Sequence, residues 1–395
     1  MGEAFGRAML AHFPLAPGGV YLNHGTVGVT PLAVMCARSA ILDEIERHPS
    51  RFMIRELMDL GMSAPPEAPR LRAAAARVAA FLGADGDGLV FVDNASAGVN
   101  AVLRSVLRPG DEIVIHDQAY GGVARAVDFI ARERGASVQT FALPWPARDP
   151  ADFVRAVESA ITPRTRLALL DHVCSETALI LPLAEMAAAC RARGVAVLVD
   201  GAHAPGAIDL DIASLGVDWY AANLHKWAVA PRSCGVLWAA PERRAGLHPG
   251  VISWGVTNDD WLQEFDWTGT RDPSPWLAAP AGLDFMRDVL GIEAMRAYNH
   301  RLAWQSAVRL AARWGRPWTT PESMIGCMAS VPLPARFAPA DAANASRLRD
   351  ALLFEHGIEI PVIARGGALW LRLSAQVYND ESDVERLADA IDALR

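Results

Sequence analysis

Strand-like runs of four to eight residues alternate with segments of helical periodicity over the first 285 residues. Such runs predict buried strands, and the segments between them predict connecting helices. We expect strands at residues 89–92, 112–115, 137–143, 166–173, 195–199 and 234–238, and helices at residues 97–107, 121–134, 152–161 and 183–193. Strands that alternate with helices favour a mostly parallel sheet covered on both faces, so the sequence predicts an α/β fold.

The alternation ends near residue 285. A long helical pattern at residues 292–314 follows, and strand-like stretches at residues 330–333 and 368–373 come after it. This mixture predicts a smaller α+β domain. We therefore expect an N-terminal segment at residues 1–18, a large domain at residues 19–285 and a small C-terminal domain at residues 286–395.

Two ionisable residues stand after buried runs. Asp200 directly follows the apolar residues 195–199, and Lys226 comes shortly after the apolar residues 219–222. Read singly, the lysine is more often a surface charge and the aspartate a cap or turn residue. Together, a poorly hydrated amine and a buried carboxylate are what pyridoxal phosphate requires. The lysine would form the Schiff base, and the aspartate would keep the ring nitrogen protonated.

A phosphate site is expected where residues 93–98 join a strand to a helix. Backbone N–H groups at the helix N-terminus and the Ser96 hydroxyl suit a phosphate. The run Asn94-Ala95-Ser96 is also typical of an ordinary helix cap, and the same atoms can serve both purposes. The chain has no G-x-G-x-x-G and no Walker loop, so a dinucleotide or ATP has no support.

Two further side chains invite a functional interpretation. Tyr120 follows a predicted strand and can stack on a pyridine ring, although core packing is the alternative. Arg372 lies within the apolar strand at residues 368–373, where a charge needs a partner. A substrate carboxylate and an internal salt bridge are both possible partners.

Composition excludes several classes of protein. The net charge is −8 and no Lys/Arg-rich run occurs, which argues against nucleic-acid binding. The five cysteines are scattered and form no CxxC pair, as in reduced cytosolic proteins. The N-terminus does not read as a signal peptide, and no uninterrupted apolar run would span a bilayer. We expect a cytoplasmic protein without membrane contact.

Six stretches in the expected order resemble one family. They are residues 21–28, 89–95, 200–206, 225–227, 267–272 and 371–375. In these stretches the chain resembles the class V aminotransferase family of fold-type I pyridoxal phosphate enzymes, and within it the isopenicillin N epimerase-like branch. The resemblance implies the fold-type I architecture, with a large cofactor-binding domain and a smaller C-terminal domain. It also implies pyridoxal 5'-phosphate as the cofactor.

The resemblance implies a role for each matching residue. Lys226 would carry the cofactor and move the substrate's α-proton, Asp200 would pair with the ring nitrogen, and His203 would lie near the ring hydroxyl. Ser175 is a possible helper at the ring. The phosphate would be bound by Ala95, Ser96, Asn223 and His225. Thr270 would reach the phosphate of a neighbouring subunit, which implies a homodimer. The substrate pocket would be lined by Asn23, His24 and Arg372.

The expected activity is chemistry at the α-carbon of an amino acid or of a compound that ends in one. An epimerase or racemase ranks first by resemblance, a C–S β-lyase second and an aminotransferase third. A non-catalytic binding homologue is a distant rival. A metal-dependent hydrolase that uses His172, His203 and His225 is another, although their spacing matches no ligand motif. The substrate and the second proton donor cannot be predicted from the sequence.

The chain departs from the cysteine desulfurases of this family. They carry a nucleophilic cysteine on a mobile loop late in the chain, where the only candidate here is Cys327. It adjoins a strand-like run without a Ser/Gly-rich loop, so we do not expect persulfide chemistry. Cys174 lies near the expected cofactor site, and we interpret it as a small buried hydrophobe.

Overall fold

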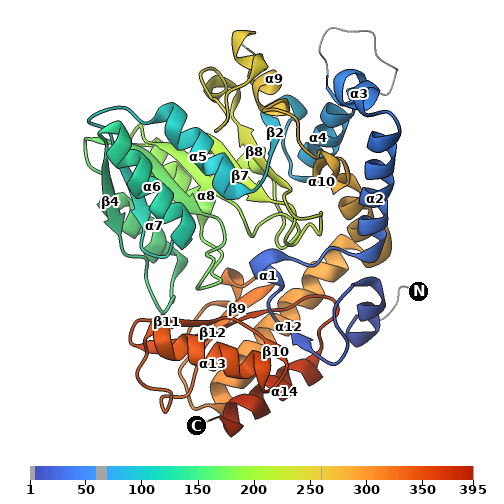
Figure 1. Cartoon of the computed structure of the whole chain (residues 1–395). Coiled ribbons are helices and arrows are strands. Elements are labelled where there is room, and N and C mark those ends of the chain that lie inside the picture. Colours follow the sequence, from blue (N-terminus) through green and yellow to red (C-terminus); the bar gives the residue numbers. More distant parts are fainter. Residues whose placement is uncertain (1–4, 59–68, 259, 395) are drawn as a thin grey trace.

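The computed structural model describes residues 5–58, 69–258 and 260–394. The chain forms a larger part built on a seven-stranded sheet and a smaller part, coloured orange to red in Figure 1, built on a three-stranded sheet. Residues 1–4 of the predicted N-terminal segment and residue 395 lie outside the described residues.

The larger sheet has the strand order β2-β8-β7-β6-β5-β3-β4. Its strands are β2 (Leu89–Val92), β3 (Glu112–His116), β4 (Ser137–Phe141), β5 (Thr165–Asp171), β6 (Ala196–Asp200), β7 (Trp219–Asn223) and β8 (Gly235–Ala239). The neighbours from β7 to β4 are parallel, and β8 is antiparallel to both β7 and β2. The predicted mostly parallel α/β sheet is confirmed.

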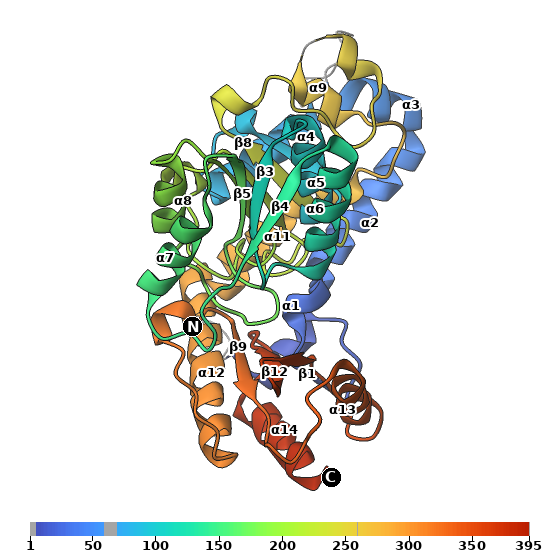
Figure 2. The same ribbon diagram turned by 90° about the vertical axis from the view of Figure 1, so that its left-hand side faces the viewer.

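Helices cover both faces of this sheet because its inner strands are apolar on both sides. In β5, Leu167 and Leu169 face one helical layer, while Ala168 and Leu170 face the other. The first layer holds α5 (Ala95–Val106), α6 (Gly121–Arg134) and α9 (Trp261–Asp266). The second holds α4 (Arg70–Phe81), α7 (Pro150–Ala160), α8 (Leu183–Arg191) and α11 (Ala279–Asp284). Figure 2 shows α5 and α6 on one side of the sheet and α7 and α8 on the other.

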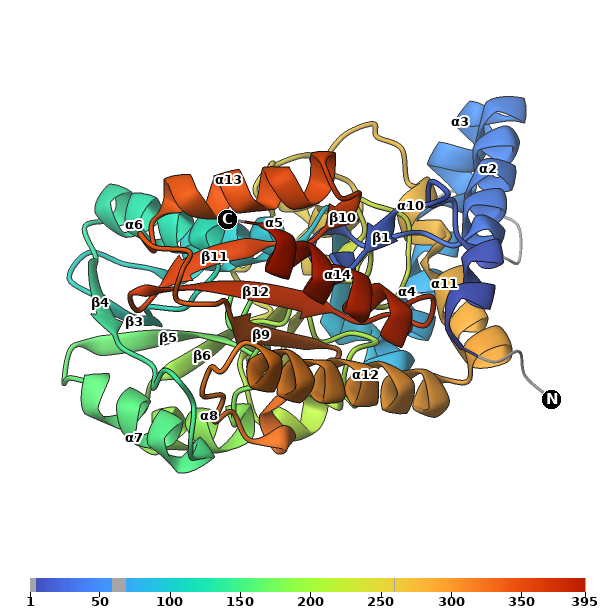
Figure 3. The same cartoon turned by 90° about the horizontal axis from the view of Figure 1, so that it is seen from below.

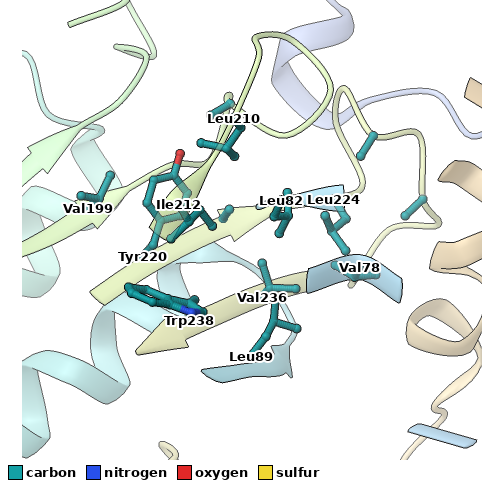
Figure 4. Packing of buried hydrophobic residues seen from close by; sticks show 14 of the residues in the cluster. Val78, Leu82, Leu89, Val199, Leu210, Ile212, Tyr220, Leu224, Val236 and Trp238 are labelled. Atoms are coloured by element: carbon teal, nitrogen blue, oxygen red, sulfur yellow. The ribbon is translucent and has the colours of Figure 1, made fainter. Parts of the chain in front are cut away.

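Packing on the second face is tight around β7 and β8. Figure 4 shows Val78 of α4 and Leu82, which directly follows α4, beside Val236 of β8, with Tyr220 of β7 in the same cluster. The Tyr220 hydroxyl lies 2.7 Å from His172 Nδ1, so this buried tyrosine keeps a hydrogen-bond partner.

The smaller part contains β9 (Met328–Pro332), β11 (Val362–Arg365) and β12 (Ala368–Ser374) in the antiparallel order β11-β12-β9. Helices α12 (Ile292–Arg313), α13 (Ala342–Phe354) and α14 (Glu381–Ala393) lie over this sheet (Figure 3). The N-terminal strand β1 (Val20–Tyr21) pairs with β10 (Ile358–Glu359), and Val20 and Leu22 pack in the smaller core. The division at residues 285 and 286 stays a prediction.

The remaining helices connect these parts. They are α1 (His24–Val27), α2 (Leu32–Arg47), α3 (Pro49–Arg51) and α10 (Ser274–Leu277), with the short helical turns Arg7–His12, Phe52–Glu56, Gly86–Gly88, Ile212–Leu215, Pro241–Arg243, Trp254–Thr257, Phe285–Leu290 and Glu322–Met324. The stretch His24–Arg47 is the one helical segment of the described chain that is long and apolar enough to cross a membrane. Core helices of soluble proteins also meet that test, and only a third of this segment is buried in the structure.

Candidate active site

A cavity of about 270 Å³ opens at the carboxyl edge of the large sheet. Three neighbouring strands, β5, β6 and β7, end there. Their last residues are Asp171, Asp200 and Asn223, and the side chains of these residues point to the face of the sheet that α5 covers. This central cavity is lined by Thr26, Asn94, Ala95, Ser96, Tyr120, Asp171, Val173, Ser175, Asp200, Ala202, His203, Asn223, His225 and Lys226. Its size is near the lower end of small-ligand pockets, roughly 300 Å³.

Lys226 meets His203 inside the cavity. The Lys226 Nζ atom lies 3.1 Å from His203 Nε2, and Trp227 Nε1 donates to His203 Nδ1 over 3.5 Å. Because the indole can only donate, the imidazole carries its proton on Nε2 and donates it to Nζ. Only an uncharged amine can accept that bond. Burial, with the nearby charge of Arg372, lowers the pKa of Lys226, so geometry and electrostatics agree on a nucleophilic amine.

Asp200 is a buried acid without a cation bonded to it. Its Oδ1 accepts a hydrogen bond from the Ala202 backbone N–H at 3.0 Å. Burial raises the pKa of Asp200, and a negative charge on the neighbouring Asp171 would raise it further. A carboxylate in this position is suited to a cationic N–H group brought in by a ligand.

The opposite end of the cavity is formed by the N-terminus of α5. Asn94 caps this helix by accepting from the Ala97 N–H at 3.0 Å, as the sequence predicts. The Ala95 N–H donates to Asn223 Oδ1 at 2.8 Å, and His225 Nδ1 donates to the Cys234 carbonyl at 3.0 Å. The Ser96 hydroxyl and His225 both line the cavity, where the hydroxyl can donate to a phosphate. His225 can donate from Nε2 only in its protonated form, because Nδ1 carries the proton of the neutral ring.

Arg372 lies directly behind the cavity wall. It donates to the Ser175 carbonyl at 2.7 Å, to the Thr26 hydroxyl at 2.6 Å and to Asn23 Oδ1 at 3.2 Å. Its Nε is buried without a hydrogen-bond partner, and it forms no ion pair within the described residues. Burial lowers the pKa of Arg372 to about 10. Within the described residues, the structure thus shows no internal salt bridge to Arg372, and both of its terminal nitrogens donate to groups in and behind the cavity wall.

The other two predicted substrate residues, His24 and Asn23, lie outside the cavity wall and contact residues around it. His24 is fully buried, and its ring nitrogens are bonded to the Tyr378 hydroxyl at 2.9 Å and the Lys226 carbonyl at 3.0 Å. Asn23 donates to Glu359 Oε1 at 3.3 Å. Neither residue lines the cavity in the structure. We therefore find His24 positioning the Lys226 backbone, while Asn23 orients Arg372.

Tyr120 and Thr270 differ in their relation to the central cavity. Tyr120 stands just before α6, lines the cavity and is half exposed, which leaves its ring free to cover a ligand. Thr270 does not line the cavity. It lies in a neighbouring depression together with Asp93 and Asn94, and Asn94 belongs to both. Thr270 therefore lies outside the wall of the central cavity formed by the same chain.

The model of the family described as Aminotransferase class-V matches residues 53–387, most of the chain. The chain belongs to the class-V aminotransferase family. A protein named isopenicillin N epimerase from Streptomyces clavuligerus is 35% identical over 99% of this chain and 98% of its own length. A probable L-cysteine desulfhydrase of Arabidopsis thaliana is 30% identical over 94% of this chain and 82% of its own length.

Solved structures of this family share the fold. The cysteine desulfurase CsdA from Escherichia coli has a TM-score of 0.75 at 25% identity and covers 99% of this chain and 98% of its own. A C-DES mutant with glycine covalently linked to its PLP cofactor has a TM-score of 0.77 at 21% identity, covering 98% of this chain and 99% of its own. For this class-V aminotransferase family member, the predictions of a fold-type I enzyme and of pyridoxal 5'-phosphate as its cofactor are confirmed.

The cysteines of this class-V family member do not suit a nucleophilic role. Cys327 is buried and its thiol donates to the Ala207 carbonyl at 3.3 Å, and burial raises its pKa to about 12. Burial also raises the pKa of Cys174. A thiol attacks as its thiolate, so neither side chain is prepared for persulfide chemistry.

The three histidines of the alternative metal site are engaged separately. His172 meets the Tyr220 hydroxyl, His203 meets Lys226, and His225 donates to the Cys234 carbonyl. The group of potential ligands that does converge in the described chain is a different one, formed by His116, Asp171 and Cys174.

Sequence reasoning missed two polar residues of the cavity wall. Asp171 follows an apolar run just as Asp200 does, and the same signal would have found it. Thr26 gave no such signal because it belongs to α1, which reaches the cavity only through the fold.

Proposed function

We propose that this protein is an epimerase or racemase of the isopenicillin N epimerase kind, acting at the α-carbon of an amino acid or an amino-acid-ended compound. The observation that carries the proposal is the convergence of Lys226 Nζ, His203 and Asp200 in one cavity that also holds the α5 N-terminus. The identity of 35% over nearly the whole chain to an isopenicillin N epimerase supports the choice of reaction.

The residues of the cavity suit the ring nitrogen, the ring hydroxyl and the phosphate of pyridoxal 5'-phosphate. Asp200 would pair with the ring nitrogen, His203 would lie near the ring hydroxyl, and Ser96 with His225 would hold the phosphate. The cofactor supplies an electron sink for the charge left at the substrate's α-carbon. The uncharged Lys226 amine would hold the cofactor through its aldehyde and would take the α-proton from one face of the substrate. Epimerisation also requires a second donor that delivers a proton to the opposite face. Arg372 would hold the substrate carboxylate.

Loading with the cofactor is the first test. The purified protein, incubated with pyridoxal 5'-phosphate and then desalted, should keep a visible absorption band that Lys226→Ala loses. A wild-type protein that stays colourless would refute the proposal. The matched control is Lys226→Arg, which keeps a long basic side chain at this position and should also stay colourless, because a guanidinium does not attack an aldehyde.

The reaction itself is separated by three readouts on one substrate. In deuterium oxide, any chemistry that begins with loss of the α-proton exchanges that position with solvent. Chiral chromatography then detects epimerisation, keto-acid release detects transamination, and sulfide release detects β-elimination. We expect deuterium at the α-position of the substrate together with formation of the product that has the opposite configuration at that carbon. Exchange without any change of configuration would rule out the epimerase.

A C–S β-lyase is the second candidate function. It is favoured by the similarity to proteins named L-cysteine desulfhydrase, at 30% identity over most of both chains. L-cysteine and isopenicillin N are therefore the two substrates to compare first. Aminotransferase activity ranks third and has only the family description behind it.

We further propose a cytoplasmic homodimer whose two sites are completed across the interface. Thr270 lies beside its own cavity rather than within it, as expected for a residue that serves a neighbouring subunit. Large apolar side chains are exposed on α1, α2 and the segment after residue 250: Val27, Leu32, Met35, Val251, Ile252, Trp254 and Val256. Such side chains suit burial against a second copy. The five free cysteines favour a reducing compartment.

A further inference from the structure

Epimerisation needs two proton-carrying groups, one on each side of the substrate's α-carbon. The proposed function assigns one of them, the Lys226 amine. Candidates for the other line the wall of the central cavity. Most of these side chains already serve another part of the site, and the Tyr120 phenol is the one that is free to act from the other side.

The acidic and basic side chains of the wall lie where the cofactor would be held. Asp171 and Asp200 end adjacent strands in register, so both stand at the ring-nitrogen end of the site. Ser96 and His225 lie at the phosphate end, beside the N-terminus of α5. His203 is bonded to the lysine amine and therefore lies on the lysine's side.

Two aliphatic hydroxyl groups of the wall are unsuited to the role. Thr26 donates its proton to Asn23 Oδ1 and accepts from Arg372, so both capacities of this hydroxyl are in use. Ser175 Oγ lies 3.5 Å from Arg372 Nη1. An aliphatic alcohol is a much weaker acid than a phenol, and acid–base catalysis in proteins uses the phenol of tyrosine instead. Tyr120 is therefore the proton donor that remains on this wall.

Tyr120 stands across the cavity from Lys226. Lys226 follows β7 and Tyr120 follows β3, and β6 and β5 lie between these two strands in the sheet. Neighbouring strands are about 4.8 Å apart, so the three steps from β7 to β3 span roughly 14 Å. A flat ring above the end of β6, where Asp200 stands, has the lysine on one side and the tyrosine on the other.

The phenol ring is held at this place by the start of α6. Tyr120 directly precedes this helix, and a Cβ on Gly122 would lie 2.7 Å from the Tyr120 Cε1 atom. Only glycine leaves room for the ring against the first turn. The Tyr120 hydroxyl forms no hydrogen bond with any residue that the structure describes, and the residue is half exposed. Its proton is free to be donated and can be replaced from water.

We propose that Tyr120 is a catalytic residue, which exchanges a proton with the substrate's α-carbon on the face opposite Lys226. In one direction the Lys226 amine takes the α-proton and becomes an ammonium group, and the electron pair of the broken bond stays with the substrate. The phenol O–H bond then breaks, a C–H bond forms on the other face, and Tyr120 is left as a phenolate.

Both groups return to their starting forms through solvent. The phenolate takes a proton from water and the ammonium group releases one to water, so the cycle is balanced without another reactant. In the reverse direction the phenolate takes the proton and the ammonium group gives one. This inference rests on the proposed function.

The test follows each configuration of a substrate separately in deuterium oxide. Isopenicillin N and its epimer at the amino-acid α-carbon are the first pair of probes, and L-cysteine and D-cysteine are the second. In Tyr120→Phe, the epimer whose α-proton faces Lys226 should still exchange it for deuterium and keep its configuration. The other epimer should no longer exchange, and inversion should fall about 100- to 10,000-fold in both directions.

Two results would overturn the inference. Inversion by Tyr120→Phe at the wild-type rate would assign the second proton to another group. Loss of exchange from both epimers would show that the hydroxyl serves the site in some other way. The matched control is Tyr298→Phe, which removes a hydroxyl that donates to the Asn379 carbonyl outside the cavity and should leave exchange and inversion unchanged.

Cofactor loading gives a readout that does not depend on turnover. Tyr120→Phe keeps the aromatic ring, so its visible band should match that of wild type, with cofactor affinity within about threefold. Tyr120→Ala removes the ring, and its affinity should fall about tenfold. A tenfold loss already in Tyr120→Phe would show that the hydroxyl binds the cofactor, against the inference. A wild type that inverts neither pair of probes would instead refute the proposed function, and the inference with it, before any variant is compared.

Discussion

Lys226 owes its reactivity to its neighbours. The indole of Trp227 sets the tautomer of His203, and His203 then presents an N–H to the lysine amine. A protonated lysine would bring two donors together at 3.1 Å, so the arrangement selects the free base. The reactive form is thus built into the hydrogen bonds before any ligand arrives.

Arg372→Lys is expected to weaken substrate binding selectively. A lysine lacks the planar fork that holds a carboxylate, so KM should rise about ten- to hundredfold, the loss of one to two charged hydrogen bonds. Cofactor loading, measured by the visible band, should be unchanged. The matched control is the amide of the same amino acid, on which wild type and variant should perform alike. An equal loss on the amide would contradict the assigned role.

Acid should destabilise the protein through buried histidines, of which His24 and His172 lie outside the cavity wall. Burial lowers the pKa of His24 and of His172 to about 4. At pH 7.5 both histidines are neutral in the folded and in the unfolded protein. Below about pH 6.5 they become protonated in the unfolded chain but stay neutral in the folded chain. At pH 5 each residue should cost about 2 kcal/mol of unfolding free energy.

Urea denaturation at pH 7.5 and pH 5.0 measures this loss. His172→Asn removes one of these titrating groups, so its loss between these pH values should be smaller by about 2 kcal/mol. Equal pH dependence in the variant and the wild type would contradict the buried neutral state of His172.

At the scale of elements, the loop that ends α1 packs directly on the lysine-bearing turn. Gly28 has a φ of +69°, and a Cβ there would lie 1.9 Å from the His225 carbonyl oxygen. Only glycine combines this conformation with so close an approach. The contact keeps Thr26 against the cavity, although it is about 200 residues from His225 in the sequence.

Gly28→Ala is therefore expected to disturb the site as well as the fold. We expect a loss of unfolding free energy of about 3 kcal/mol or more, from backbone strain and steric overlap together. Cofactor affinity should fall with it. The control is Gly110→Ala, where φ is +88° but nothing lies within 4 Å of the added Cβ, and strain alone should cost about 1 kcal/mol. Equal losses in the two variants would contradict the close contact.

The sequence pattern did not predict helices that are shorter than two turns. Between residues 253 and 280 the pattern shows little periodicity, yet α9 and α10 lie there. These helices have six and four residues, fewer than two turns, so no repeat of apolar positions can show. The helices α5, α6, α7 and α8 and the strands around them, by contrast, were predicted to within a few residues. The 16-residue helix α2 was not predicted.

At the scale of the whole molecule, shared sites predict complementation between inactive subunits. Lys226→Ala and Thr270→Arg should each be inactive alone. After mixing and subunit exchange, half of the dimers are hybrids with one intact site of two, so about a quarter of wild-type activity should return. Lys226→Ala mixed with Asp200→Asn is the control, because both changes affect the same subunit's part of the site. Recovery equal to that control would contradict the shared site.

The sequence by itself determined the α/β class, the cofactor and the central pair Asp200 and Lys226, because each depends on local patterns. Apolar runs form strands, and a charge placed after such a run is carried to the sheet's carboxyl edge. Only the tertiary structure decided what surrounds them. It turned His24 away from the cavity, put Arg372 behind Thr26 and Ser175, and set His116 and Asp171 beside Asp200. Those relations join distant segments, and their geometry follows from packing, which no local pattern records.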